Sequence, residues 1–250
     1  MNRPLFACDI DNTLIYSRKH PHPGWPCVEW IHGVEQAYMS PRTIALLAEA
    51  AERTALVPVT SRSVEQALRL KLPGGLPMAV TANGADLLVD GVPDPGWRRE
   101  TDARVAPWRG EITRLRDALG DSPRYIRCRV VDDAYLFVYC AGDVDPAAEA
   151  ERLAEGTPLR VMASGKKIYL LPPPLDKGEA FDRLAARLGC PGTLAAGDSA
   201  MDLPMLLKAD AAIAPAGLGP LLPEGAHICP EGALFSEYAL ETAAELARMN

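Results

Sequence analysis

The feature of this sequence that most constrains its fold is a short apolar run that ends in two acidic residues. Residues 5–8 form the run, and Asp9 and Asp11 follow it one position apart. Continuous apolar runs of this length are typical of strands buried on both faces. Side chains alternate along an extended chain, so the two carboxylates point the same way and require a proton or a cation between them. The run therefore predicts either a two-carboxylate site at a strand end or a simple Asp-Asn turn.

Apolar runs alternate with helical patterns in the outer parts of the chain. Such alternation predicts an α/β core, in which a Rossmann-like parallel sheet carries helices on both faces. A helix is expected after Ser40, because serine suits an N-cap and a proline follows it. Pro58 conflicts with a central strand, because it has no N–H to donate. The strands predicted after the first are residues 55–59, 78–81, 193–196 and 209–214.

The middle of the chain predicts a smaller α+β domain with an antiparallel sheet and helices on one face. Its pattern is a helix and two strands, twice over: residues 108–119, 124–130, 134–140, 146–154, 159–162 and 167–171. Arg124, Arg127 and Arg129 alternate along one of these strands, which favours a solvated sheet face. We expect a discontinuous core of residues 1–85 and 168–250, with residues 86–167 inserted.

The connection between the first strand and the first helix is long. Residues 16–40 are rich in proline, glycine and histidine, and aromatic residues follow. Connections of this length inside a compact domain are functional or carry their own secondary structure. We expect either a functional flap or a short hairpin here.

Composition limits the partners. The chain of 250 residues is 48% hydrophobic and 24% charged, which is ordinary for a globular protein. Its net charge of −7 argues against a nucleic-acid or anionic-membrane surface, so an anionic substrate would need a metal or a few cations near it. No apolar run reaches membrane-spanning length. The six cysteines lack any Cys-x-x-Cys spacing and predict a reducing, cytoplasmic environment.

Four further motifs follow predicted strands or open a predicted helix. In an α/β sheet the carboxyl ends of the strands meet at one edge, where ligands bind. We therefore expect the side chains of these motifs to gather there with Asp9 and Asp11. The motifs are Thr60-Ser61-Arg62, Asn83-Gly84, Lys177-Gly178 and Gly197-Asp198-Ser199-Ala200-Met201-Asp202.

In this order the motifs resemble those of the haloacid dehalogenase superfamily of phosphotransferases. The likeness is closest to the branch that includes sucrose-phosphate phosphatase and phosphomannomutase. The resemblance implies an α/β core, an α+β cap domain that closes over the site, and Mg²⁺-dependent hydrolysis of a phosphomonoester through an aspartyl-phosphate. It also implies a small phosphorylated substrate, such as a sugar phosphate. A phosphomutase and a non-enzymatic protein that binds phosphate esters are the alternatives.

The resemblance assigns catalytic roles to four residues. Asp9 matches the nucleophile, and Asp11 matches the general acid/base that protonates the leaving alcohol and then activates water. Thr60 matches the hydroxyl that binds a phosphoryl oxygen. Lys177 matches the cation that balances charge on the nucleophile and the phosphoryl group.

The resemblance also implies a metal site and substrate contacts. Magnesium prefers oxygen ligands, and it would be held by the carboxylates of Asp9 and Asp198 and the backbone carbonyl of Asp11. Asp202 matches an acid that orients the metal's waters or the lysine, although its spacing from Ser199 also fits a helix cap. The substrate-binding residues implied are Ser61, Arg62, Asn83 and Gly84.

Two positions depart from the family pattern. Asn12 stands where the family usually has glycine, and asparagine also tolerates the left-handed conformation that such a turn requires. Ser61 stands where this branch often has glycine. These departures leave the catalytic set intact and bear on which substrate the protein uses.

Overall fold

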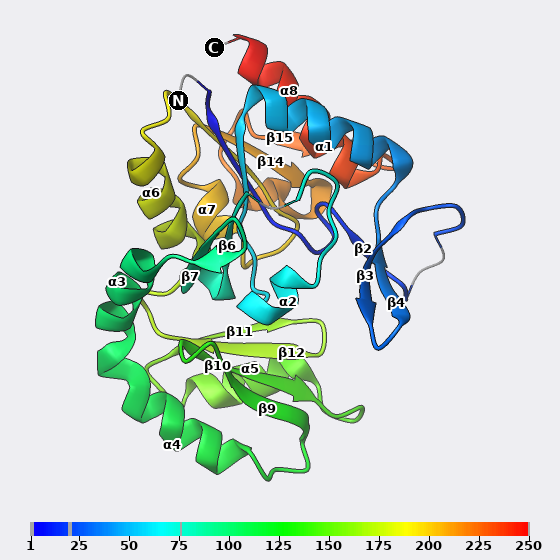
Figure 1. Ribbon diagram of the computed structural model, residues 1–250. Helices are drawn as coiled ribbons and strands as arrows, with labels where there is room; N and C mark the ends of the chain where they lie inside the picture. The colour runs from blue at the N-terminus through cyan, green and yellow to red at the C-terminus, as the bar shows by residue number, and fades with distance from the viewer. Residues whose placement is uncertain (1–2, 20–21, 76, 250) are drawn as a thin grey trace. The chain divides into compact units, whose positions relative to one another are not determined.

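The computed structural model describes residues 3–19, 22–75 and 77–249, and the chain divides into two compact units (Figure 1). Unit 1 comprises Met1–Pro93 with Lys177–Asn250, and unit 2 is Asp94–Asp176. None of the helices in the described residues is long and apolar enough to cross a membrane.

Unit 1 is built on a five-stranded parallel sheet in the order β15-β14-β13-β1-β5. All four residues of β1 are fully buried, as expected for the central part of a parallel sheet covered on both faces. The predicted parallel sheet is therefore confirmed, except that residues 78–81, expected among its strands, lie in a separate antiparallel sheet because they pair with residues 86–89. The short β15, which begins with a histidine, was not predicted. The strands are β1 (Leu5–Cys8), β5 (Ala55–Pro58), β13 (Thr193–Ala196), β14 (Ala211–Pro215) and β15 (His227–Cys229).

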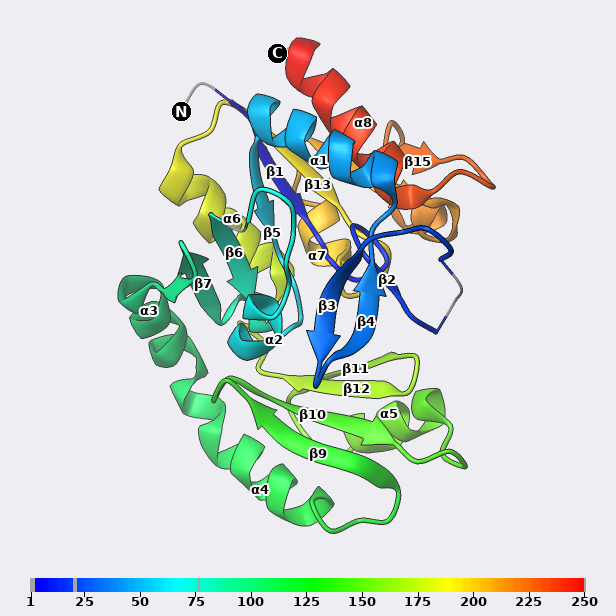
Figure 2. The same ribbon diagram turned by 45° about the vertical axis from the view of Figure 1, so that its right-hand side comes forward.

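Helices cover both faces of this sheet. Figures 1 and 2 show α1 (Pro41–Arg53) and α8 (Phe235–Met249) side by side on one face, with α6 (Lys177–Leu188) and α7 (Leu203–Leu206) on the other. Helix α1 begins as predicted: the Ser40 hydroxyl oxygen accepts a 2.9 Å hydrogen bond from the N–H of Thr43. Its apolar side packs with α8 against alternate residues of β1 in one continuous core.

The conflict at Pro58 is resolved by the position of its strand. β5 lies at the edge of the parallel sheet, where proline is tolerated because no neighbouring strand requires its N–H. The N–H of Val59 donates to the carbonyl of Cys8 at 2.7 Å, so β5 stays paired with β1 after the proline. The N–H of Thr60 donates to the carbonyl of Val80 at 2.9 Å, which joins the end of β5 to β6 (Met78–Thr81).

Two small antiparallel sheets complete unit 1. The long connection carries β2 (Tyr16–Ser17), β3 (Cys27–Ile31) and β4 (Val34–Tyr38) in the order β2-β4-β3, so it contains a hairpin. The second sheet is β6 (Met78–Thr81), β7 (Asp86–Val89) and β8 (Val92–Pro93). Because β7 pairs with β6, the hairpin after residue 85 belongs to unit 1, and unit 2 begins later than the domain expected at residue 86. The remaining helical segments of unit 1 are α2 (Val64–Leu68), η1 (Ala82–Gly84) and η3 (Ala216–Leu221).

Unit 2 is the predicted α+β arrangement, a four-stranded antiparallel sheet in the order β11-β12-β10-β9. Helices α4 (Arg109–Leu119) and α5 (Pro146–Ala154) pack on one face of the sheet, around a core that includes Leu136 and Ile168. Helix α3 was not predicted, because charged residues surround its three buried side chains, Trp97, Thr101 and Val105. The elements are α3 (Pro95–Val105), η2 (Ala106–Trp108), α4 (Arg109–Leu119), β9 (Tyr125–Val131), β10 (Tyr135–Cys140), α5 (Pro146–Ala154), β11 (Arg160–Ser164) and β12 (Lys167–Leu171).

Candidate active site

The site begins where three parallel strands end at the same level. The register pairs Cys8 of β1 with Pro58 of β5 on one side and with Ala196 of β13 on the other. Asp9 therefore leaves the sheet beside the turns that carry Thr60 and Asp198. Ligands of α/β sheets bind at this carboxyl edge.

Lys177 connects two carboxylates from different parts of the chain. Its Nζ donates hydrogen bonds of 2.5 Å to Oδ1 of Asp9 and 2.5 Å to Oδ1 of Asp202. The lysine side chain is 3% exposed, and the side chain of Asp202 is fully buried. Burial alone would lower the pKa of Lys177, but the Asp202 and Asp9 carboxylates raise it above its ordinary value. The ammonium is therefore charged, and the pair of acids fixes its position.

The second oxygen of Asp202 is also fully engaged. Its Oδ2 accepts hydrogen bonds of 2.9 Å from both the backbone N–H and the hydroxyl of Ser199. Asp202 occupies the N-cap position of α7 without a side-chain capping bond to that helix. Its carboxylate instead holds Lys177 and the turn after β13 together.

Two glycines allow these groups to approach each other. A Cβ at Gly178 would lie 2.5 Å from the carbonyl oxygen of Pro204, and a Cβ at Gly197 would lie 2.3 Å from the Cβ of Asp202. Both distances are too short for real atoms. The absent side chains let the start of α6 pack against the start of α7, which brings Lys177 to Asp202.

Three carboxylates, which we call the acidic cluster, lie together here, and two of them bind this ammonium. Oxygens of Asp9, Asp198 and Asp202 all lie within 4.8 Å of one another. Against the single charge of Lys177, the ionised cluster has an excess of two negative charges. Burial raises the pKa of Asp9, and the nearby carboxylates add to this effect while Lys177 opposes it. Burial and Asp202 raise the pKa of Asp198 to about 6.

The acidic cluster fits a divalent cation by charge and by chemistry. Magnesium prefers carboxylate oxygens, and a double positive charge would cancel the excess. Because Asp202 already accepts three hydrogen bonds, Asp9 and Asp198 are the carboxylates most suited to a metal. The side chain of Asp11 lies outside this group, and its backbone carbonyl as a ligand stays a prediction.

Asn12 is a member of the site that sequence analysis treated only as a turn residue. Its φ of 57° is the left-handed conformation expected at this position. Its side-chain Nδ2 also donates to Oδ2 of Asp198 at 3.3 Å, which a glycine would not do. The departure from the family pattern therefore adds a contact that orients one carboxylate of the acidic cluster.

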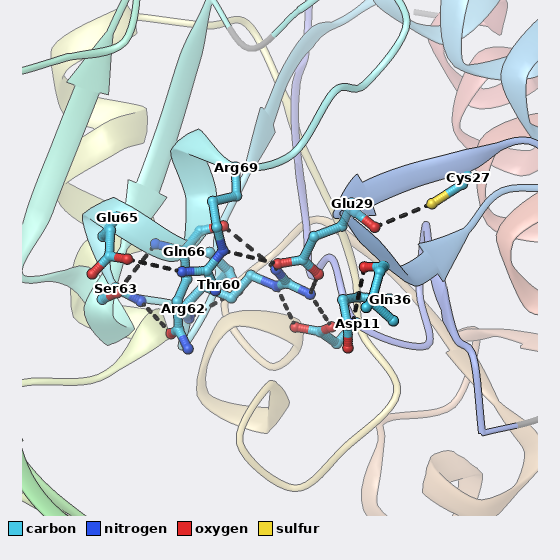
Figure 3. Close-up of polar contacts among 11 residues, drawn as sticks. Asp11, Cys27, Glu29, Gln36, Thr60, Arg62, Ser63, Glu65, Gln66 and Arg69 are labelled. Carbon is cyan, nitrogen blue, oxygen red and sulfur yellow. Dashed lines mark hydrogen bonds and ion pairs between the residues drawn. The ribbon is translucent and has the colours of Figure 1, made fainter. Parts of the chain in front are cut away.

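The side chain of Asp11 pairs with Arg62 (Figure 3). The Nε and Nη2 of Arg62 donate to the two oxygens of Asp11 at 2.9 and 2.8 Å. On its other side the guanidinium binds Glu29 of β3, a residue that sequence analysis did not single out. The only signal for Glu29 was an acidic residue within the apolar run of that strand.

The turns that carry the other predicted substrate-side residues lie next to each other. The carbonyl of Thr60 accepts a 3.0 Å hydrogen bond from the N–H of Asn83, and the Thr60 hydroxyl oxygen accepts one of 3.1 Å from the N–H of Arg62. Ser61 and Gly84 are the next residues of these two turns. Asn83 has a φ of 56°, and its buried Nδ2 has no hydrogen-bond partner among the described residues.

Comparison with known proteins identifies the fold. No protein-family model matches the sequence, and no curated protein matches it. Among solved structures, the sucrose-phosphatase of Synechocystis, in complex with sucrose and phosphate, is similar with a TM-score of 0.67 at 19% identity, covering 98% of each chain. A protein related to trehalose-6-phosphate phosphatase gives a TM-score of 0.57 at 17% identity, covering 98% of this chain and 96% of the other.

A third solved structure names the superfamily. A phosphatase of the haloalkanoate (HAD) enzyme superfamily from Bacteroides thetaiotaomicron gives a TM-score of 0.58 at 13% identity, covering 100% of this chain and 96% of that one. The chain thus has the fold of the haloacid dehalogenase phosphatases over its whole length. The resemblance expected from the motifs, including the likeness to sucrose-phosphate phosphatase, is confirmed at the level of the fold.

Proposed function

We infer that this protein is a magnesium-dependent phosphomonoester hydrolase that works through an aspartyl-phosphate. The observation that carries the proposal is the buried bridge of Lys177 between Asp9 and Asp202, with Asp198 beside it. A purely structural core has little reason to gather three carboxylates, two of them buried, near one ammonium, because buried charges without compensation are costly. A site that receives a divalent cation and a phosphate group gains from this arrangement.

Asp9 supplies the nucleophile in the first half of the reaction. Its Oδ1 is held by Lys177, while its second oxygen has no hydrogen-bond donor among the described residues and is free to attack. A bond forms between this oxygen and phosphorus as the bond from phosphorus to the leaving alcohol breaks. Asp11, whose side chain is 44% exposed, gives its proton to the leaving oxygen.

Water completes the reaction in the second half. Asp11, now ionised, takes a proton from a water molecule as the water oxygen attacks phosphorus. The bond between Asp9 and phosphorus breaks, and inorganic phosphate leaves. Asp11 is then protonated again, so protons balance over one turnover. Lys177 stays charged throughout and offsets negative charge at Asp9.

Magnesium would be held by Asp9 and Asp198, with Asn12 orienting the latter. When bound, the metal neutralises charge on the phosphate oxygens, so that an anionic nucleophile approaches an anionic ester. The backbone carbonyl of Asp11 is the third ligand in this proposal. Thr60, Ser61, Asn83 and Gly84 provide hydrogen bonds to the substrate from the neighbouring turns.

A sugar phosphate or a similar small phosphorylated polyol is the proposed substrate. The likeness to a sucrose-phosphatase structure supports this class. Unit 2, as the cap domain of the proposal, offers suitable chemistry on one face of its sheet. Arg129 lies over the ring of Phe137 at 5.8 Å, and Tyr169 packs edge-on against the same ring at 5.6 Å. Arg124, by contrast, is engaged with the buried Glu149.

The cytoplasm is the proposed compartment. All six cysteines are free thiols, of which Cys8, Cys140 and Cys229 are buried. Such thiols persist where the environment is reducing.

The decisive experiment replaces the proposed nucleophile. Asp9→Asn should abolish phosphate release from para-nitrophenyl phosphate, by about 1,000-fold or more, while circular dichroism and thermal unfolding stay cooperative. Asp182→Asn is the matched control, because this aspartate lies on the surface of α6 with its side chain 55% exposed. Activity of Asp9→Asn near that of the wild type would reject the nucleophile assignment.

A panel of sugar phosphates, followed by phosphorus NMR, separates the remaining alternatives. Hydrolysis gives inorganic phosphate. A phosphomutase would instead move the phosphoryl group between hydroxyls and would depend on a sugar bisphosphate. Tight binding of one panel member without any turnover would favour a phosphate-ester binding protein.

A further inference from the structure

The guanidinium of Arg62 uses all five of its N–H groups within the protein (Figure 3). Nε donates to Asp11, Nη2 donates to Asp11 and to Glu29, and Nη1 donates to Glu29 at 2.9 Å and to the backbone carbonyl of Gln66 at 3.4 Å. Arginine has five such donors, so none is left for a substrate phosphate in this arrangement. Substrate binding by Arg62 stays a prediction, but its contacts here point to another task.

Glu29 is an unusual residue for a surface hairpin. Its side chain is 5% exposed, and it lies between Arg62 and Arg69, whose Nε is 3.5 Å from its Oε1. A buried carboxylate is costly unless it is paired in good geometry. The two bonds of 2.9 and 3.0 Å to Arg62 provide that geometry.

The backbone of β3 is shaped around this side chain. The pairing register with β4 shifts on both sides of Glu29, as it does at a β-bulge. The usual alternation of buried and exposed side chains along a strand also fails here, because Val28 and Glu29 are neighbours and are both buried. Bulges redirect a side chain and are frequent beside active sites. The hairpin therefore presents Glu29 to Arg62 at the expense of regular pairing.

From these contacts we propose that Glu29 is a positioning residue for Asp11 and that it acts through Arg62. The inference deepens the proposed function, on which it rests, because it concerns the acid/base of that same site. Arg62 holds Asp11 by two parallel bonds, which fix the plane of the carboxyl group. Glu29 and the Gln66 carbonyl hold the opposite side of the guanidinium. The guanidinium therefore has a fixed position from which it orients the Asp11 carboxyl group.

The arrangement also assigns a task to the long connection. The hairpin β3–β4 supplies the anchor for Arg62, and α2 supplies the carbonyl of Gln66. A positioning role predicts a specific kinetic defect when Glu29 is changed. Proton delivery matters most when the leaving group is a poor one, and it matters little when the leaving group is stable as an anion.

The test compares kcat/KM for phenyl phosphate and para-nitrophenyl phosphate. Glu29→Gln should lower the value for phenyl phosphate by about 10- to 100-fold, and the value for para-nitrophenyl phosphate by less than about 3-fold. Glu35→Gln is the matched control, because Glu35 is exposed on β4 of the same hairpin and undergoes the same chemical change. It should leave both values unchanged. Equal losses on both esters, or no loss, for Glu29→Gln would overturn the proposal.

A second variant covers the case in which Glu29→Gln does not fold. Arg62→Lys keeps the charge but cannot form the paired bonds, and it should give the same selective loss on phenyl phosphate. In that background Glu29→Gln should add no further selectivity, because Glu29 acts through Arg62. If the two substitutions change the ratio of kcat/KM for the two esters independently and additively, the proposal is overturned. Absence of activity in the wild-type protein on both esters would instead reject the proposed function itself.

Discussion

Gly197 and Asp202 approach so closely that a Cβ at position 197 would lie 2.3 Å from the Cβ of the aspartate. We expect Gly197→Ala to displace Asp202 and, with it, Lys177. A displacement of 1 Å can cost about 100-fold in rate, so phosphatase activity should fall by about that factor. Gly217→Ala is the control, since nothing lies within 4 Å of its added Cβ. Equal activities of the two variants would contradict the packing argument.

Lys177→Met should remove activity and reduce stability at neutral pH. The substitution leaves Asp9 and Asp202 buried without their shared cation, and breaking a buried pair in this way costs about 3–5 kcal/mol. Thermal unfolding without magnesium measures the loss.

Lys208→Met provides a direct contrast to this variant. Lys208 also bridges two acids, at 3.1 Å from Glu179 and 2.5 Å from Asp182, but its side chain is 34% exposed. Surface pairs contribute about 0–1 kcal/mol, so its loss should be small. Similar losses of stability in both variants would show that burial does not determine how much the Lys177 bridge contributes to the free energy of unfolding.

Magnesium should stabilise the protein through the acidic cluster. A ligand present at 100 times its dissociation constant adds about 2.7 kcal/mol to the free energy of unfolding. We expect a rise of several degrees in Tm, reversed by EDTA, and no rise in Asp198→Asn. Asp210→Asn, which alters an aspartate bonded to Thr193, should keep the full shift. A shift that survives Asp198→Asn would place the metal elsewhere.

Unit 2 should lose stability in acid through Glu149. Arg152, Arg124 and Tyr125 hydrogen-bond its carboxylate, and together they lower the pKa of Glu149 to about 2 against the opposing effect of burial. A pKa lowered by folding stabilises the protein above the unfolded value, near 4.5, and this contribution is lost as pH falls toward 2.

Glu149→Gln should therefore flatten the fall of Tm between about pH 4.5 and pH 2. Glu155→Gln, an exposed glutamate at the end of α5, should retain the slope of the wild type. Identical slopes in the wild type and Glu149→Gln would contradict the prediction.

Most of the helices and strands were predictable because each is specified by residues that are neighbours in the sequence. The continuous apolar run of β1 and the cap at Ser40 both involve neighbouring residues. The alternation of strands and helices along the chain, with motifs after the strands, then allowed the motifs to be assigned to one edge of a sheet. That inference is consistent with the bridge between Lys177 and Asp9, which are 168 positions apart.

Contacts that depend on tertiary geometry were not predictable in this way. Nothing in the sequence near Glu29 shows that a bulge turns it toward Arg62, because the bulge exists only in the pairing with β4. The pairing of Asp11 with Arg62 likewise depends on how two turns from different strands lie against each other. Helix α3 was missed because its burial comes from only three side chains.

The central position of β1 has a consequence for biosynthesis. One neighbour, β5, follows soon after it, but the other, β13, is synthesised only after the whole of unit 2. Until then one edge of this buried strand lacks its partner and is exposed to aggregation. Nascent chains that stop before residue 196 should therefore depend on chaperones, whereas chains that include β13 can pair both edges of β1.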